Sequence, residues 1–510
     1  MEILFVGVCL FFVIWLYFHN NPLQHTRRFI WRRFVNWFPL GMSYAFLYMG
    51  RYNLNVSKNA LGTLMTKEQF GIIFGVGTAV YGLSFLLNGP LVDKIGGKKG
   101  IIIATLGSSI ANIMMGVLTY LILQDQLKVN LTMAFSILYA VNMFFQSYGA
   151  VSIIKVKAYW FHVRERGVFG AIFGTLISFG VYFAFDWGQA IVDAAQVHPT
   201  KTLNTFQQFI QTVFAINTGT TDAIWLVFFI PAFILIFWAL VDTVLLKDTP
   251  EEANFDPFDP HDASSDDGMD REYTMGELLR KIFTSRILLT IALIEFTSGV
   301  IRNGIMQWYF IFAKEIPQKG VEYLHTNWGF ILCVMGIIGG FSAGFISDKL
   351  FHSRRGPPAA IFNFMMLILT VIMSLVIFTS PVGVGSAAVL ISLAVIGVHS
   401  MMSGTAAADF GGRKATATAS GIVDGFVYLG SGVQSISLGY LTTKSWQYWP
   451  LFLIPFTMMG LIFSVMMWKA LPSATRKYLK MVEKVDLVFG REGEIVISEV
   501  TQISVETDTK

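Results

Sequence analysis

Two arginines lie inside long apolar runs of this chain, and their chemistry suits the binding of an anion. Arg302 lies within the stretch 287–312, and Arg51 lies at nearly the same depth within a second stretch at 38–56. A charged side chain at that depth of a bilayer costs several kcal/mol unless it meets a partner or a water-filled cavity. The guanidinium fork matches phosphate oxygens in pairs and stays charged at any working pH. The matched depths therefore predict that both arginines bind one phosphate-like anion.

A competing interpretation is that each arginine neutralises a buried acid. Glu295 lies seven residues before Arg302, so on a helix it would share the same face, two turns away. An ion pair between these two residues therefore remains an alternative to anion binding.

Other polar side chains within apolar runs are candidates for lining the same site, since tyrosine combines an apolar face with a hydroxyl group. These candidates are Tyr48, Tyr52, Gln146, Tyr148, Gln307, His399 and Tyr428. Each of them alone is more typical of a hydrogen bond between helices. His399 and Asp424 are also a titratable pair on neighbouring predicted helices, and with Glu295 they are candidates for proton coupling.

The composition indicates a protein with many membrane-spanning helices. Of the 510 residues, 54% are hydrophobic and only 14% are charged, and the mean hydropathy is +0.58. This balance lies outside the range of soluble domains. No nucleophile arrangement, metal cluster or nucleotide-binding loop is apparent, so the sequence supports neither an enzyme nor a cofactor, a metal or a nucleic-acid partner. We expect a monomer in a lipid bilayer.

Apolar runs of about 20 residues predict an all-α fold with thirteen membrane helices. They lie near 3–18, 36–57, 69–91, 101–123, 131–153, 167–191, 223–246, 287–313, 326–347, 358–380, 386–409, 416–442 and 448–470. The first run is preceded by Glu2 and followed by the arginine cluster 27–33, the reverse of a cleavable signal peptide. We therefore expect a retained extra helix whose N-terminus lies outside.

Lysine and arginine are concentrated in alternate loops, which the positive-inside rule assigns to the cytoplasm. The basic segments are 27–33, 94–99, 155–166, 247–286, 349–355, 413–414 and 476–491. The twelve core helices then begin and end in the cytoplasm, and a long loop near 193–222 lies outside. A bacterial inner membrane fits this pattern best.

Repeated spacings divide the chain into two halves of similar design. Arg51 precedes Asp93 by 42 residues, and Arg302 precedes Asp348 by 46. Two-half transporters hold the substrate near the middle of the membrane, between the halves. The predicted divisions are an extra helix with a basic linker (1–35), a first six-helix half (36–246), an acidic cytoplasmic linker (247–286), a second half (287–471) and a cytoplasmic tail (472–510).

Two loops carry a repeated glycine and aspartate motif. The sequence GPLVDKIGGKK occupies 89–99, and GFISDK occupies 344–349. At this point the chain resembles the major facilitator superfamily, whose signature loop has this form and recurs in the second half. The resemblance implies a charged latch that breaks as the halves rock. Its members here would be Asp93, Lys94, Asp348, Lys349 and Arg166.

A narrower resemblance rests on further motifs, which are MGRYN at 49–53, FQSYG at 145–149, WFHVRERG at 160–167 and IRNG at 301–304. Over about residues 36–470 the chain is similar to the organophosphate:phosphate antiporter family. This family includes glycerol-phosphate and hexose-phosphate transporters and sugar-phosphate sensors. The resemblance implies that Arg51 and Arg302 clamp the substrate phosphate, and that inorganic phosphate is the exchanged partner.

The chain also departs from this family. Lysines of glycerol-phosphate and hexose-phosphate carriers align with Tyr52 and Phe85, acids align with Gln307 and Val334, and a histidine aligns with Ile177. An entire set of ion pairs is thus replaced by neutral groups, which argues against glycerol 3-phosphate itself. We expect exchange of a phosphorylated organic anion by alternating access. The alternatives are a membrane sensor of external sugar phosphate that signals to a partner kinase, and a proton-coupled anion carrier.

Overall fold

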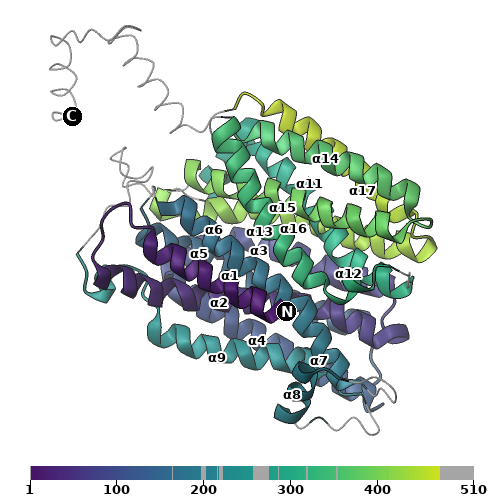
Figure 1. Cartoon of the computed structure of the whole chain (residues 1–510). Helices are drawn as coiled ribbons and strands as arrows, with labels where there is room; N and C mark the ends of the chain where they lie inside the picture. Colours follow the sequence, from purple (N-terminus) through teal and green to yellow (C-terminus); the bar gives the residue numbers. More distant parts are fainter. Residues whose placement is uncertain are drawn as a thin grey trace, which may run out of the picture.

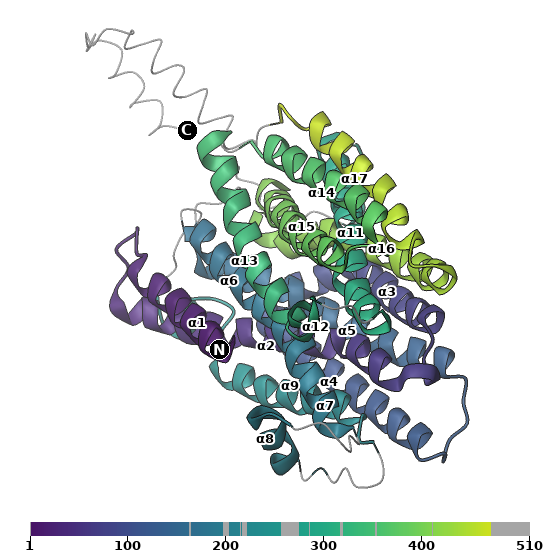
Figure 2. The same cartoon turned by 45° about the vertical axis from the view of Figure 1, so that its right-hand side comes forward.

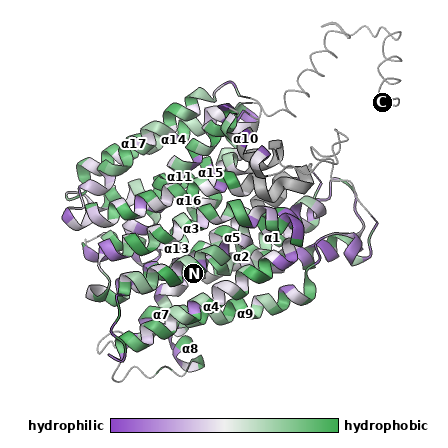
Figure 3. Cartoon of the chain, turned by 180° about the vertical axis from the view of Figure 1, so that it is seen from behind, coloured by the Kyte–Doolittle hydropathy of each residue, from purple (hydrophilic) through white to green (hydrophobic). Residues whose placement is uncertain are grey.

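The computed structural model describes residues 2–162, 165–196, 203–214, 216, 222–256, 275–284, 286–316, 320–351, 354–410 and 412–470. Every regular element in these ranges is a helix (Figure 1). Ten of the described helices are long and apolar enough to cross a membrane. Hydrophobic residues cover the helices along most of their length (Figure 3). The predicted all-α integral membrane fold is confirmed.

The long helices form two sets of six, as predicted (Figure 1). The first set is α2 (Arg27–Leu61), α3 (Lys67–Ile95), α4 (Gly97–Leu123), α5 (Leu131–Trp160), the run α6, η3 and α7 (Arg166–Tyr182, Phe183–Trp187 and Gly188–Ala195) and α9 (Leu226–Leu245). The second set is α11 (Arg286–Glu315), α13 with η5 (Trp328–Phe345 and Ile346–Leu350), α14 (Gly356–Val376), α15 (Pro381–Phe410), α16 (Gly412–Lys444) and α17 (Tyr448–Met466).

Shorter helices flank the two sets. They are α1 (Glu2–His19), η1 (Gly62–Leu64), α8 (Thr205–Val213), η4 (Glu251–Ala253), α10 (Met275–Thr284) and α12 (Glu322–Thr326). The helix α1 is the predicted extra helix. It packs along α2, where Tyr17 contacts Trp37, and reaches the second half, where Phe5 contacts Phe330 of α13 (Figure 2).

The helix α2 begins at Arg27 rather than near residue 36. The reason is local, because the hydroxyl of Thr26 accepts a hydrogen bond from the backbone N–H of Phe29 at 3.3 Å and so caps the helix. The basic segment 27–33 therefore forms the first turns of the helix that carries Arg51.

The two halves approach most closely where α3 crosses α16. A Cβ atom added at Gly82 would lie 2.7 Å from the carbonyl oxygen of Gly425, and one added at Gly71 would lie 2.8 Å from the Cα atom of Gly439. Only glycine allows two backbones to approach this closely. The crossing lies beside Tyr81 of α3 and Tyr428 of α16, which both contact Arg51.

The start of the predicted linker is packed against the first half. Lys98 of α4 donates its backbone N–H to Asp248 at 2.7 Å, and burial raises the pKa of this carboxyl group. Asn36 of α2 donates to the carbonyl oxygen of Lys247 at 3.0 Å. Most of the acidic part of the linker and the tail 472–510 lie outside the described residues.

Candidate functional site

The guanidinium group of Arg51 is fully buried and surrounded by neutral acceptors. Nε donates to Gln146, Nη1 to the hydroxyl of Tyr428, and Nη2 to the hydroxyl of Tyr81, each at 2.9 Å. A guanidinium group has five N–H donors. Two of them, one on each terminal nitrogen, have no hydrogen-bond partner among the described residues.

A network of amides and hydroxyls fixes the position of this arginine. Gln146, which accepts from Arg51, donates in turn to Ser108 at 3.1 Å and to Asn142 at 3.2 Å. Asn142 donates to the carbonyl oxygen of Gly50 at 3.0 Å, and Tyr139 donates to the carbonyl oxygen of Arg51 at 3.0 Å. Both the side chain and the backbone of Arg51 are therefore held from α5 and α4.

The second arginine, Arg302, has few partners. Its Nη2 atom lies 3.5 Å from the hydroxyl of Tyr48, and its Nε atom is buried without a hydrogen-bond partner. Trp449 and Trp328 donate to the carbonyl oxygens of Gly304 and Met306, at 2.7 Å and 2.8 Å, and so hold this part of α11. The helix is firmly positioned, whereas the charged group that it carries is left largely unsatisfied.

The ring of Tyr48 connects the two arginines. The Cζ atom of Arg51 lies 4.8 Å from the centroid of this ring, on which the guanidinium can make a cation–π contact. Arg302 approaches the hydroxyl group of the same residue. Among the described side chains, no carboxylate lies within 4.0 Å of either arginine. Two buried positive charges on opposite halves thus lie around one tyrosine, and no described carboxylate contacts either of them.

A second polar link between the halves lies beside the arginines. The hydroxyl of Tyr52 donates to Asn303 at 3.3 Å, and Gln307 donates to the same oxygen atom at 3.5 Å. Asn303 also donates to Ser431 of α16. Tyr52 and Gln307 are predicted site residues that the structure brings together through Asn303. Tyr148 instead packs its ring against Phe144.

The predicted proton-coupling residues lie on α11, α15 and α16. Glu295 is fully buried, and its Oε2 atom lies 2.8 Å from Nδ1 of His399. Asp424 accepts a hydrogen bond from Ser403 at 2.8 Å. Glu295 therefore pairs with His399 and not with Arg302, and the described contacts of 4.0 Å or less include no ion pair between His399 and Asp424.

The structure describes the side chains of three predicted latch residues, Asp93, Lys94 and Lys349. Asp93 forms an ion pair with Lys155 of α5 at 2.9 Å, a residue that sequence reasoning did not single out. Lys94 and Lys349 are exposed. The side chains of Asp348 and Arg166 lie outside the described residues. The contact of Asp93 with Lys155 lies within the first half, at the end of the bundle that carries the basic loops.

At the opposite end, polar contacts join the two halves. Lys67 at the start of α3 lies 2.8 Å from Glu315 at the end of α11, and Lys58 of α2 lies 3.7 Å from the same carboxylate. Asp186, in the π-helical turn between α6 and α7, accepts from the backbone N–H groups of Gly329 and Phe330 at 2.8 Å and 2.7 Å. This carboxylate satisfies free donors in the first turn of α13. The predicted outer end is thus closed by contacts between the halves.

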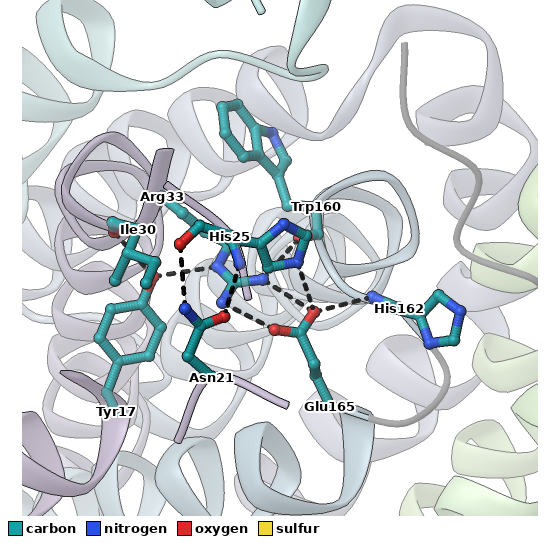
Figure 4. Close-up of polar contacts among 8 residues, drawn as sticks. All are labelled: Tyr17, Asn21, His25, Ile30, Arg33, Trp160, His162 and Glu165. Atoms are coloured by element: carbon teal, nitrogen blue, oxygen red, sulfur yellow. Dashed lines mark hydrogen bonds and ion pairs between the residues drawn. The ribbon is translucent and has the colours of Figure 1, made fainter. Parts of the chain in front are cut away.

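A buried ion pair joins α2 to the segment after α5 (Figure 4). Arg33 donates to both oxygens of Glu165, at 2.8 Å and 2.9 Å, and its Nε atom donates to Tyr17 of α1 at 3.0 Å. Burial raises the pKa of Glu165, but its contacts with His25 and Arg33 outweigh burial and hold the pKa at about 2. The hydrogen bond from Arg33 to Tyr17 links the extra helix to this ion pair and so to the first half.

Sequence reasoning missed several residues of the site. Tyr81 is the most important, since its hydroxyl accepts a hydrogen bond from Arg51 and its ring packs at a tilt on that of Tyr428, at 4.2 Å between ring centroids. Phe85, which replaces a lysine of the family, packs on Tyr81 one helical turn earlier. A tyrosine four residues before Phe85, on the same face of α3, was the available signal.

Comparison with known proteins identifies the class of protein that this fold and site define. Residues 40–435 match the Major Facilitator Superfamily, and the chain belongs to this superfamily of membrane transport proteins. A solved bacterial homologue of the human lysosomal transporter Spinster, in an inward-facing and occupied conformation, has a TM-score of 0.58 at 14% identity. The likeness covers 85% of this chain and 96% of that chain, and it confirms the fold alone.

Two similar relatives are named as transporters of organic phosphates, and a third is named as a membrane sensor. The glycerol-3-phosphate transporter of Bacillus subtilis (strain 168) is 22% identical over 422 residues, which cover 79% of this chain and 84% of that protein. A probable hexose phosphate transport protein of Chlamydia pneumoniae is 24% identical over 462 residues, covering 86% and 92%. The membrane sensor protein UhpC of Escherichia coli (strain K12) is 25% identical over 426 residues, covering 82% and 88%. The resemblance stated from the sequence is confirmed.

Proposed function

We propose that this protein exchanges a phosphorylated organic anion for inorganic phosphate across a membrane. The observation that carries the proposal is the pair of buried guanidinium groups, Arg51 and Arg302, on opposite halves and without an acid within 4.0 Å among the described residues. A phosphate dianion between them would neutralise both charges and occupy the donors that remain. The names of the relatives support the same substrate class.

Alternating access supplies the mechanism. The contacts of Glu315 with Lys67 and of Asp186 with the start of α13 join the halves at the predicted outer end. At the other end, the described ion pairs of Asp93 and Glu165 lie within the first half. This asymmetry supports a state that opens to the cytoplasm. Release of the outer contacts would open the site to the outside of the membrane.

The proposed setting is a bacterial inner membrane, with a monomeric protein whose basic loops face the cytoplasm and whose N-terminus lies outside. The UhpC relative supports a second candidate function, a sensor that binds external sugar phosphate and signals to a partner kinase. A proton-coupled anion carrier, with His399, Asp424 and Glu295 as proton sites, is the third.

Uptake measurements with protein reconstituted in liposomes distinguish these three functions. Liposomes loaded with inorganic phosphate would be offered labelled hexose and triose phosphates, with and without a pH gradient. We expect uptake that depends on internal phosphate and not on the gradient. Binding without uptake would favour the sensor, uptake driven by the pH gradient would favour proton coupling, and absence of both binding and uptake would contradict all three.

A further inference from the structure

Beside the two arginines lies a group of acceptors that phosphate binding does not use. Glu295 is 0% exposed, and its Oε1 atom is buried without a hydrogen-bond partner. Its other oxygen contacts His399, whose side chain is 25% exposed. A buried carboxylate oxygen that lacks a donor is costly, so native structures normally satisfy it. The free Oε1 atom therefore points to a donor supplied by a ligand.

Two helices place acids on the same side of the arginines. On α11, Glu295 precedes Arg302 by seven residues, a rise of about 10 Å. On α16, Asp424 precedes Tyr428, the partner of Arg51, by one turn. Both helices begin at the end of the bundle that carries the basic loops, so both acids are displaced from the arginines toward that end.

We propose that Glu295, held by His399, forms a second subsite that accepts hydrogen bonds from the organic part of a phosphate ester. This inference rests on the proposed function. Arg51 and Arg302 hold the phosphate, and the ester extends toward the cytoplasmic end, where its hydroxyl or ammonium groups donate to Glu295. Asp424, held by Ser403 at 2.8 Å, adds acceptor oxygens on the neighbouring helix. The substrate is therefore a phosphate ester whose organic part carries hydroxyl or ammonium donors.

This arrangement explains how the site selects among phosphate compounds without the lysines of related carriers. An alkyl phosphate of the same length would leave the carboxylate of Glu295 unsatisfied. A site built to bind hydroxyl groups rejects analogues that lack them much more strongly than a purely apolar pocket does. Inorganic phosphate does not reach the subsite, so Glu295 acts on it through charge alone and not through a hydrogen bond.

Competition against labelled inorganic phosphate, with the full purified chain in detergent, tests the inference. The competitors are hexose 6-phosphate, 2-aminohexose 6-phosphate and n-hexyl phosphate. We expect the parent to prefer each donor-bearing ester over hexyl phosphate by at least about tenfold. Glu295→Met removes both acceptor oxygens at similar volume, and Glu295→Gln is isosteric. Both should reduce the preference for the donor-bearing esters to less than about threefold while phosphate still binds.

The competition experiment needs a control variant that changes an acid far from the proposed subsite. Glu68→Gln changes an exposed acid at the start of α3 and should keep the preference of the parent. Tighter binding of the amino sugar would assign an ammonium donor to the subsite, and equal binding would assign hydroxyl groups. An unchanged preference in both Glu295 variants, with phosphate binding intact, overturns the subsite alone. A parent that binds no phosphate compound overturns the proposed function as well.

Discussion

The carboxylate of Glu295 lies 2.8 Å from the imidazole of His399. Glu295 stands two turns before Arg302 on α11 and is the acid best placed on that helix to neutralise it. Its contact with His399 leaves both arginines without a carboxylate within 4.0 Å in the described part of the chain. The charge balance of the empty site therefore differs from that of the loaded site.

This imbalance predicts obligate exchange. Closing the empty protein would occlude two guanidinium groups of like charge, at a cost of several kcal/mol, whereas a bound phosphate dianion offsets both. We expect labelled phosphate to leave liposomes at least about tenfold faster when unlabelled phosphate is present outside, since 1.4 kcal/mol corresponds to tenfold in rate. Equal efflux rates in the two buffers would contradict the prediction.

The variant Glu295→Gln tests whether this carboxylate affects the exchange requirement. The structure pairs Glu295 with His399 and not with Arg302, so the variant should still require external phosphate for rapid efflux. A different result would implicate Glu295. If the parent releases phosphate without external phosphate and the variant does not, Glu295 neutralises the empty site.

Removal of Glu165 should destabilise the protein. The variant Glu165→Ala leaves the buried guanidinium of Arg33 without its bidentate partner, and breaking such a pair costs about 3–5 kcal/mol. Thermal unfolding in detergent at neutral pH measures the effect. Glu251→Ala, at an exposed acid, is the control. Similar melting temperatures for the two variants would show that the ion pair does not stabilise the fold.

The same ion pair predicts that the stability of the fold depends on pH. The pKa of Glu165 is about 2 in the fold against an ordinary value of 4.5. A lowered carboxyl pKa stabilises the fold fully above the unfolded value, and this stabilisation disappears as the pH falls from about 4.5 toward 2. The difference in the free energy of unfolding between the parent and Glu165→Gln should therefore decrease as the pH falls through that window. A constant difference from pH 6 to pH 3 would contradict this assignment.

The contact of Glu315 with Lys67 should favour closure of the predicted outer end. Both side chains are partly exposed, so the pair is worth up to about 1 kcal/mol. In Glu315→Gln we expect up to about fivefold faster labelling of a cysteine at Asn59, which contacts Phe310 across the halves. A membrane-impermeant thiol reagent measures this in a background without Cys9 and Cys333. Glu322→Gln, an exposed acid nearby, should not change the rate.

The positions of the helices and of the two arginines were predictable from hydropathy and spacing, because both signals are local. The partners of the charged groups were not. Lys155 meets Asp93, and Asp186 meets the first turn of α13, across elements far apart in the chain. Such contacts depend on the rotation of each helix about its axis. Spacing alone placed Glu295 on the face of Arg302, but His399 of α15 lies closer to its carboxylate.

The helix α1 predicts an external N-terminus. It leads into the basic turns of α2, which the positive-inside rule assigns to the cytoplasm. We expect an epitope tag before Met1 to be cleaved by protease added to intact cells. Tags placed after the last residue should be protected. A protected N-terminal tag, or its loss from the mature protein, would contradict this topology.

The most direct test of phosphate binding by Arg51 and Arg302 is calorimetric titration of purified protein with inorganic phosphate. Lysine keeps the charge but lacks the bidentate fork. We therefore predict that Arg51→Lys and Arg302→Lys each bind phosphate at least tenfold more weakly than the parent, about 1.4 kcal/mol, while Lys67→Arg binds like the parent. Parental affinity in both lysine variants would contradict a two-arginine phosphate site.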